Sequence, residues 1–281
     1  MLDLLGSLFT WKAAAIALAL LNLKNLPLVW HVRVFRYFFA NGWHNPPHFV
    51  PKLPASQIFE PASMTSRAPF AEIDYNMHKS NSTYFSDLDV SRTKLMCGLT
   101  VKATRILEQQ LAKEGKKNGR LAIILGSVYT AFKREIPPYM KYEVRSKVLG
   151  WDQKWIYIVT WFVKPARSGK KQTGDGEDFM KKNLLAMSIS KYVVKKGRYT
   201  VPPKDVFEAA GYGLFENETN GVNGSASGCN FNTQKKSSDS DDIFWSSERL
   251  DEERRRGVEV VQPFIDEEDR LVREFLREVT A

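Results

Sequence analysis

Four side chains able to do chemistry follow one another at short intervals between an expected strand and an expected helix. Asp74 is followed by His78, Asn81 and Tyr84, at positions +4, +7 and +10. A carboxylate at such a junction can take a proton from water as a general base, or attack an acyl carbon directly. The unpaired N–H groups at the start of the following helix can stabilise the oxyanion that forms. The pattern therefore indicates hydrolysis of an acyl compound.

The segment around these residues resembles the signature of the hotdog-fold thioesterases of the 4-hydroxybenzoyl-CoA type. Many members read D-x-x-x-H-x-N-N-x-x-Y, and residues 74–84 read DYNMHKSNSTY. Residues 134–164, together with the apolar N-terminus, look like the thioesterase superfamily member six type. They also look like thioesterases of fungal secondary-metabolite gene clusters. The resemblance covers about residues 66–212.

This resemblance implies an α+β hotdog fold, in which an antiparallel sheet wraps around a long helix. It implies an acyl thioesterase whose substrate is an acyl-CoA or acyl-carrier-protein thioester, with Asp74 as the catalytic carboxylate. It implies no metal and no cofactor. It further implies a homodimer or homotetramer whose active sites form between subunits, so that the helix that polarises the carbonyl can come from the neighbouring chain.

Each residue of the motif also has a structural interpretation. Asp74 can cap a turn, and His78 can either orient Asp74 or a water, or be a buried structural histidine. Asn81 can serve as a helix N-cap, although some relatives have a histidine there as a second catalytic group. Tyr84 lies on an apolar face, which favours core packing over contact with substrate. Met77 replaces the glycine that usually precedes the family's histidine, so the loop can differ.

One long amphipathic helix is expected over Ser82–Leu99, directly after the motif. Its large apolar side chains fall within an arc of about 60°, and they are Tyr84, Leu88, Leu95 and Leu99. Ser80, which replaces the first asparagine of the motif, or Asn81 can cap its N-terminus. A second, more polar helix is expected over Lys102–Lys113. A long helix followed by strands favours an antiparallel sheet packed on that helix.

Four segments are expected to be strands: Leu121–Arg134, Lys141–Val148, Trp155–Val163 and Leu184–Val194. Residues 141–148 alternate strictly, with Tyr142 and Val144 on one face and Arg145 and Lys147 on the other, as in a half-buried strand. Residues 155–163 are apolar on both faces, as in a central strand. Turns are expected at Gly150–Asp152 and in the Gly/Lys-rich residues 167–177.

Residues 1–42 are expected to form an apolar helix and a candidate membrane anchor. Leu4–Leu23 contains twenty residues and one charge, Lys12. Twenty helical residues just span a core of about 30 Å, but a central charge costs about 2.5–3.5 kcal/mol. A single-pass anchor, a peripheral attachment and a helix docked on the domain all stay open. The basic residues that follow would leave the domain cytoplasmic. Pro-rich residues 43–65 are expected to form an extended linker.

The chain carries 41 Lys and Arg against 32 Asp and Glu, a formal net charge of +9. Coenzyme A phosphates could account for part of this surplus, because several basic residues lie on or beside the expected strands: Arg134, Lys141, Arg145 and Lys147. A nucleic-acid partner is not expected, since no RNP-type aromatics, recognition helix or metal knuckle accompanies the charge. The two cysteines exclude a disulfide framework and a zinc site with three or four thiolates.

The C-terminal part divides into two further regions. Residues 213–245 are rich in Gly, Ser, Asn and Asp and are expected to be a low-complexity linker. Residues 246–281 contain eleven acidic and seven basic residues. Their apolar spacing predicts an amphipathic helix, or two helices separated at Pro263. This tail can be a solvated appendage or can bind a partner.

Two other functions stay open at this point. Hotdog hydratases couple an aspartate to a histidine in D-x-N-P-[LIV]-H, but here His78 lies one residue closer to Asp74 and the proline is absent. The chain could also be a membrane-tethered acyl-binding scaffold that keeps the fold without turnover, because no second acid is evident. Release of free thiol from a thioester separates the hydrolase from both.

Overall fold

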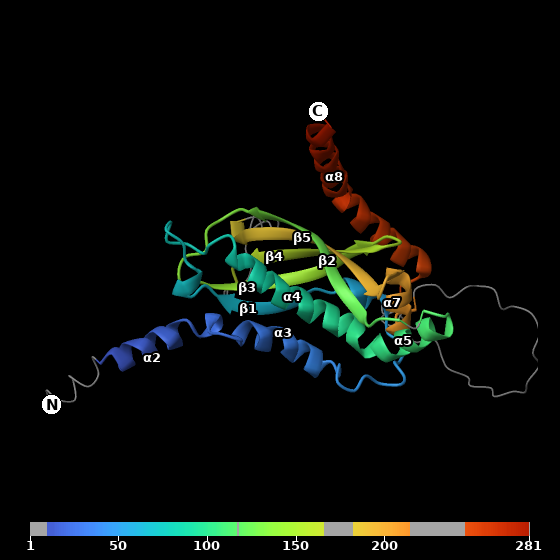
Figure 1. The fold of residues 1–281 in the computed structure, drawn as a ribbon, viewed down its shortest axis with the longest axis horizontal. Coiled ribbons are helices and arrows are strands. Elements are labelled where there is room, and N and C mark those ends of the chain that lie inside the picture. Colours follow the sequence, from blue (N-terminus) through green and yellow to red (C-terminus); the bar gives the residue numbers. More distant parts are fainter. Residues whose placement is uncertain (1–9, 117, 166–181, 214–244, 281) are drawn as a thin grey trace, which may run out of the picture.

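The computed structural model describes residues 10–116, 118–165, 182–213 and 245–280 (Figure 1). Six strands form one antiparallel sheet in the order β1-β3-β4-β5-β2, with β6 paired to β5. The strands are β1 (Ala62–Arg67), β2 (Leu121–Phe132), β3 (Lys141–Trp151), β4 (Trp155–Val163), β5 (Leu184–Lys196) and β6 (Tyr199–Val201). This sheet curves around the helix α4 (Thr83–Thr100), which confirms the expected α+β hotdog architecture.

The central helix forms because most of its apolar side chains repeat at helical spacing and are buried on one face. The four residues of the expected arc are at most 8% exposed: Tyr84, Leu88, Leu95 and Leu99. The expected second helix is also present, as the short 3-10 turn η4 (Val101–Ala103) followed by α5 (Thr104–Lys113). The capping prediction is wrong, because Ser82 occupies the N-cap position of α4 and makes no side-chain cap bond.

The alternating and apolar segments predicted the central strands well. In β3 the side chains of Tyr142 and Val144 are buried against α4, whereas Arg145 and Lys147 are half-buried on the outer face. β3 runs through Trp151, so the turn to β4 is tighter than expected. Asp152 closes that turn by accepting hydrogen bonds from the N–H groups of Lys154 and Trp155, each at 2.7 Å.

The prediction of an extended linker over residues 43–65 is wrong for its C-terminal part. The 3-10 turn η2 (Ala55–Phe59) buries Ala55, Ile58 and Phe59 in the core. β1 then pairs with β3 along its whole length, from Ala62 opposite Ser146 to Arg67 opposite Lys141. The chain therefore joins the sheet before the motif begins, and β1 leads directly to the candidate site.

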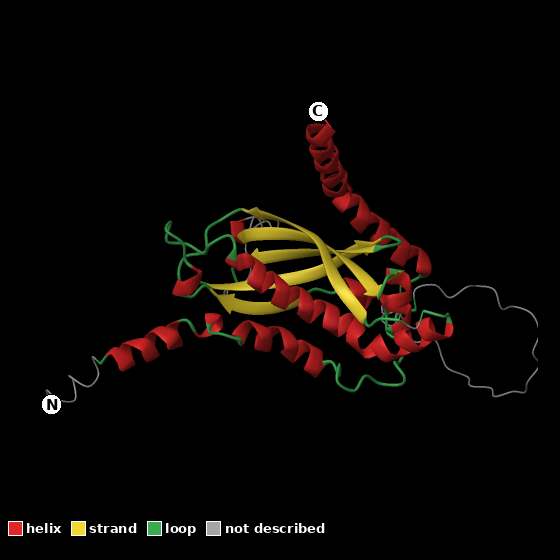
Figure 2. Cartoon of the chain, viewed as in Figure 1, coloured by secondary structure: helices red, strands yellow, loops and turns green. Residues whose placement is uncertain are grey.

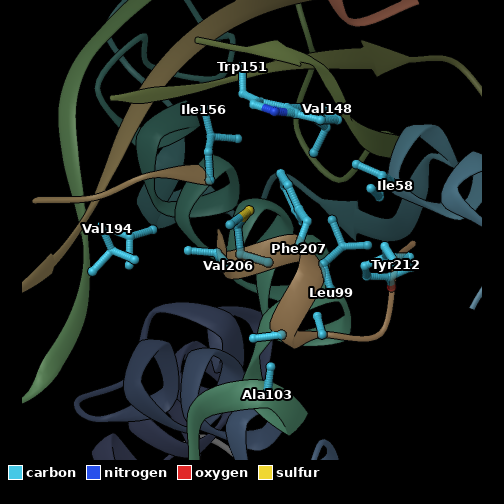
Figure 3. Close-up of a cluster of buried hydrophobic side chains, with 14 of the residues drawn as sticks. Ile58, Leu99, Ala103, Val148, Trp151, Ile156, Val194, Val206, Phe207 and Tyr212 are labelled. Atoms are coloured by element: carbon cyan, nitrogen blue, oxygen red, sulfur yellow. The ribbon is translucent and has the colours of Figure 1, made fainter. Parts of the chain in front are cut away.

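Two hydrophobic clusters fill the space between sheet and helix. One lies around the C-terminal half of α4, where Phe207 of α7 (Pro203–Ala209) lies between Leu99 and Trp151 of β3 (Figure 3). The other lies at the N-terminal half of α4, where Tyr84 and Leu88 meet Phe162. The second cluster supports the end of the sheet at which the motif lies, among the loops drawn in green at one end of the molecule in Figure 2.

The N-terminal region is an arm of two helices, α2 (Trp11–Leu21) and α3 (Val29–Ala40), joined by the 3-10 turn η1 (Leu23–Asn25). The arm lies below the sheet in Figure 1, and α3 packs on α4. No residue of α2 is buried. Within the described ranges, no helix has the length and apolar character needed to span a bilayer. The expected helix over Leu4–Leu23 is described only from residue 10 onward and ends at Leu21.

The C-terminal tail is one helix, α8 (Ser247–Thr280), which continues through Pro263 instead of ending there. It crosses β3 so closely that a Cβ on Gly257 would lie 1.7 Å from the carbonyl oxygen of Leu149. Only glycine permits this crossing. The other expected features of this region, the linker up to residue 244 and Cys229, lie outside the described residues, as do residues 167–177.

Candidate functional site

Asp74 lies at the start of a tight turn, here called the site turn (Asp74–His78). The expected strand before Asp74 is wrong, because the short 3-10 element η3 (Phe70–Glu72) leads into the turn. A β-bridge between Ile73 and Lys79 closes it. The N–H of Asp74 donates to the carbonyl of His78 at 3.0 Å, and the N–H of Met77 donates to the carbonyl of Asp74 at 3.1 Å. The turn thus reverses the direction of the chain and brings Asp74 and His78 close together.

Met77 has a φ of +61°, in the left-handed region that glycine adopts without strain. This is the position at which the resembled family has glycine. Methionine therefore adopts, at this position, a conformation that costs it about 1–2 kcal/mol.

The carboxylate of Asp74 and the ring of His78 face each other across the turn. Oδ1 of Asp74 lies 3.6 Å from Nδ1 of His78, and the two side chains are 23% and 22% exposed. The same Oδ1 accepts a hydrogen bond from the N–H of Asn76 at 2.9 Å. On its far side, Nε2 of His78 lies 3.9 Å from Glu135. Asp74 is thus partly open to solvent, oriented by its own turn, and one small movement from a hydrogen bond with His78.

Asn81 lies on the surface just before α4, and its side chain does not cap the helix. The N–H groups of Thr83, Tyr84 and Phe85 donate to carbonyls one turn back. Within the part of the chain that the structure describes, the N–H groups of Asn81 and Ser82 donate to no backbone carbonyl. Two successive amides at the helix start are therefore available to an oxygen atom of a ligand.

Tyr84 belongs to the core and not to the surface of the site. It is 2% exposed and packs edge-on against Phe132 and Phe162, each with ring centroids 5.0 Å apart. Burial raises the pKa of its hydroxyl, and the charges of Asp87 and Asp74 raise it further. The core-packing interpretation of this residue therefore agrees with its position.

A buried group of charged and polar side chains, here called the ion cluster, lies directly beneath the site turn. It comprises Lys24, Arg33, Glu72, Lys79, Asp87 and Tyr142. Asp87 is at its centre and is fully buried: it accepts hydrogen bonds from Lys24 at 2.9 Å, Arg33 at 2.9 Å and Tyr142 at 2.5 Å. The sequence analysis missed this group entirely.

The charges of the ion cluster control the ionisation of its members. Burial alone would raise the pKa of Asp87, but the charges of Lys24 and Lys79 and the hydrogen bond from Tyr142 hold it below its usual value. For Tyr142, burial and the charges of Asp87 and Glu72 raise the pKa of the hydroxyl. Asp87 is therefore ionised and Tyr142 is neutral, which matches the direction of the hydrogen bond between them.

Both ends of the site turn are held by the ion cluster. Glu72 precedes the turn and Lys79 follows it, and their side chains meet at 2.5 Å. The carbonyl of Glu72 accepts a hydrogen bond from the N–H of Ser80 at 2.7 Å, and the N–H of Lys79 donates to Ile136 at 2.8 Å. The position of Asp74 thus depends on buried residues that flank the turn.

The four basic residues expected to bind substrate do not gather at one place. Arg134 lies on the surface in the loop that also carries Glu135, so it is close to His78. Lys141 is exposed at the start of β3. Arg145 and Lys147 lie on the opposite face of β3 from α4, and Arg145 donates to Glu143 at 2.8 Å. Within one chain, only Arg134 and Lys141 are at the end of the sheet where the motif lies.

A signal for part of the ion cluster was present in the sequence. Asp87 follows Tyr84 by three residues and precedes Ser91 by four, so it lies on the buried side of α4. A carboxylate on such a face needs a buried cation. The partner Lys24 comes from 63 residues earlier in the chain, and no local pattern could have identified it.

Three other features of the described residues do not add to the candidate site. A cavity of about 580 Å³ lies between α8 and the outer face of the sheet, and its lining includes Tyr129, Tyr157 and Phe264 but no residue of the site turn. No group of three or more potential ligands is arranged to hold a metal ion within the described ranges. Cys97 is buried, and burial raises the pKa of its thiol to about 12, so it is not poised as a nucleophile.

Comparison with known proteins bears on this arrangement. The family model described as Thioesterase-like superfamily matches residues 68–190. Thioesterase lcsJ of Purpureocillium lilacinum is 34% identical over 299 residues, which cover 95% of this chain and 93% of that protein. Thioesterase poxG of Penicillium oxalicum is 32% identical, over 91% of this chain and 84% of its own. Among solved structures, the YbaW probable thioesterase from Escherichia coli has a TM-score of 0.39 and 10% identity, covering 53% of this chain and 96% of that one.

Proposed function

Because the chain belongs to the thioesterase-like superfamily, and is therefore a thioester hydrolase, we propose that Asp74 is the carboxylate that carries the reaction. The observation that supports this role most directly is the geometry of the site turn. It holds a partly exposed carboxylate 3.6 Å from a histidine nitrogen, in a turn that precedes α4 in the chain. A general base must be open to water and held in place, and Asp74 meets both conditions.

In the proposed reaction, Asp74 takes a proton from a water molecule as the water oxygen attacks the acyl carbon. The carbonyl oxygen becomes an oxyanion, which the N–H groups of Asn81 and Ser82 would stabilise, either in the same chain or across a subunit interface. The C–S bond then breaks, and the leaving thiolate takes the proton held by Asp74, which restores the carboxylate. His78 orients the carboxylate or the water. Direct attack by Asp74 would give an acyl-enzyme anhydride, which water would then hydrolyse.

The substrate is proposed to be an acyl-CoA or an acyl-carrier-protein thioester. Coenzyme A presents a pyrophosphate and a 3′-phosphate, and cationic side chains near the site turn would attract them. Arg134 and Lys141 are exposed at that end of the sheet. Arg145 and Lys147, on the outer face, would contribute only to a long-range field that attracts either donor.

Two features of the surface support the proposed assembly and location. β2 is an edge strand that pairs only with β5 among the described strands, and such an edge can pair with a second copy. We propose a homodimer, or a homotetramer built from it, on this basis. The arm exposes many large apolar side chains, which supports peripheral attachment to a membrane.

The test compares the wild-type protein with Asp74→Asn on a panel of acyl-CoA and acyl-carrier-protein thioesters, with free thiol as the measured product. Asparagine keeps the shape but cannot accept the proton, so kcat is expected to fall about 10²- to 10⁴-fold. Asp269→Asn, at an exposed position of α8, is the matched control and should retain wild-type activity.

Three results would contradict the proposal. Full activity in a folded Asp74→Asn protein would remove Asp74 from the mechanism. Hydration of a trans-2-enoyl-CoA without release of thiol would identify a hydratase. Tight acyl-CoA binding without hydrolysis at any chain length would identify a non-catalytic acyl-binding scaffold. The chain-length profile from the same panel would define the acyl group.

A further inference from the structure

We propose that Lys24 of the N-terminal arm is a positioning residue for the site turn, so that the arm forms part of the catalytic apparatus. The inference rests on the proposed role of Asp74. It concerns a lysine that lies outside the motif and outside the residues 68–190 that match the family model.

Lys24 joins four separate parts of the chain through one ammonium group. Its Nζ lies 2.8 Å from Glu72 and 2.9 Å from Asp87. It also donates to the carbonyl of Arg67 at 3.1 Å and to the hydroxyl of Tyr142 at 3.2 Å. These partners belong to β1, η3, α4 and β3. A single side chain therefore fixes the segment before the site turn against the helix and the sheet.

The contact with Glu72 is the one that transmits position to Asp74. Glu72 is two residues before Asp74, and its side chain is 2% exposed. It bridges Lys24 on one side and Lys79 on the other, and Lys79 directly follows the site turn. Loss of Lys24 would leave Glu72 held from one side only. The turn could then shift, and a misplacement of about 1 Å can lower a rate about a hundredfold.

The corner of the arm makes a second, uncharged attachment to the same segment. Asn22 is 8% exposed, and its Oδ1 accepts a hydrogen bond from the N–H of Ala71 at 2.7 Å. The hydroxyl of Tyr139 donates to the carbonyl of Leu21 at 3.1 Å. The arm therefore contacts η3 through a side-chain hydrogen bond and through an ion pair. η3 leads directly into the site turn.

Charge balance alone does not explain a lysine at this place. Within the ion cluster, Glu72 and Asp87 carry two negative charges, and Lys79 and Arg33 already supply two positive ones. Lys24 adds a third cation at a side-chain exposure of 14%. Burial lowers its pKa despite the nearby carboxylates, so it is placed there at an electrostatic cost. We infer that Lys24 acts by holding its partners in position and not by balancing charge.

The experiment measures kcat and KM for Lys24→Met, which keeps an unbranched side chain one atom shorter but donates no hydrogen bond. We expect kcat to fall between about tenfold and a hundredfold with KM changed less than about twofold, because the substrate contacts stay in place. The matched control is Lys204→Met, at a lysine 49% exposed in a surface ion pair with Glu208. It should leave both constants unchanged. Circular dichroism and a urea titration confirm that each variant is folded.

A second variant keeps the test decisive if Lys24→Met does not fold. Asn22→Ala removes the hydrogen bond to Ala71 without altering any charge, and it should lower kcat by a smaller factor at unchanged KM. Wild-type kcat in folded Lys24→Met, or in Asn22→Ala when the first variant is unfolded, overturns the inference.

Asp74→Asn, measured alongside, separates the two proposals. If Asp74→Asn is inactive and Lys24→Met is fully active, only the positioning role fails. If Asp74→Asn is fully active, the proposed function of Asp74 fails, and any loss in Lys24→Met must then act through another group, which also ends the positioning proposal as stated.

Discussion

At the scale of single residues, the candidate site separates groups that face substrate from groups that hold them. Asp74 and His78 meet across one turn, so sequence spacing alone could place them together. The groups that hold the turn are Glu72 and Lys79, and their charges are completed by Lys24 from the arm. Local chemistry was therefore predictable, whereas its support depended on a contact between distant segments.

Asp87 allows a prediction about stability and pH. Replacing Asp87 with Asn would leave the surrounding cations without their central carboxylate, because Asp87 contacts Lys24, Lys79 and Arg33. We expect the free energy of unfolding at pH 7 to fall by about 3–5 kcal/mol, the usual cost of breaking a buried ion pair. Urea titration of both proteins measures this difference, and the exposed Asp269→Asn serves as the control.

Asp87→Asn should also change how the free energy of unfolding depends on pH under acidic conditions. The pKa of folded Asp87 is below its ordinary value, so its contribution is complete above about pH 4 and is lost as the pH falls toward the lowered pKa. The wild-type protein should lose this component below about pH 4, and Asp87→Asn should not. Parallel pH dependence in the two proteins would show that Asp87 is not held ionised by the cluster.

At the scale of elements, the regular spacing of hydrophobic residues determined which helices and strands could be predicted. β4 and α4 carry long, regular patterns, and their predicted bounds differ from the observed ones by at most one residue at either end. β1 reads ASMTSR, which is short and polar, so it lacks an apolar pattern and is a strand only because β3 pairs with it. The 3-10 turn η2 was hidden among prolines. Pairing with β3 determined β1, and burial in the core determined η2. A local sequence pattern contains neither kind of contact.

The arm exposes an apolar surface that could bind a membrane. Ile16, Leu18 and Leu20 of α2 are 60–67% exposed, and residues 4–59 contain no Asp or Glu. An apolar, carboxylate-free surface suits a membrane that contains anionic lipids. We expect the full chain to co-sediment with vesicles of phosphatidylcholine and phosphatidylserine, and Leu18→Glu/Leu20→Glu to reduce partitioning about a hundredfold. Each buried leucine would otherwise contribute about 1.5–3 kcal/mol.

The control for this experiment is Leu271→Glu, at a leucine 66% exposed on the opposite, C-terminal helix. It should sediment like the wild-type protein. Equal sedimentation of the α2 double variant and the wild type would mean that the arm is not the attachment surface. Activity on a water-dispersed thioester should be unchanged in the double variant, since the contacts of Lys24 and Asn22 are untouched.

At the scale of the whole molecule, α8 covers part of one face of the sheet. α8 covers β3 through the contact of Gly257 with Leu149 and then crosses toward β2, where Glu268 pairs with Lys191 of β5. The helix then continues beyond the sheet (Figure 1). The edge of β2 stays uncovered by any described strand. The sequence could predict β2 but not that it would form an edge, because strand order depends on long-range pairing.

The open edge leads to a prediction about assembly. Several large apolar residues of β2 are 38–49% exposed, namely Ile124, Leu125, Tyr129 and Phe132. If two β2 edges pair antiparallel, these side chains become buried and the active sites of both copies are brought next to one interface. Ile124→Lys should then weaken the dimer at least about tenfold, because edge lysines oppose strand pairing. Light scattering after size exclusion measures the mass as a function of concentration.

Activity provides the second measurement of this prediction. If each site draws groups from both chains, the lysine variant should lose specific activity on dilution in step with its loss of dimer, and high protein concentration should restore it. Leu28→Lys, at an arm residue 70% exposed, controls for the added charge and should stay dimeric. A variant that is monomeric yet fully active at every concentration would locate the whole site within one chain, with Asn81 and Ser82 of that chain serving the same Asp74.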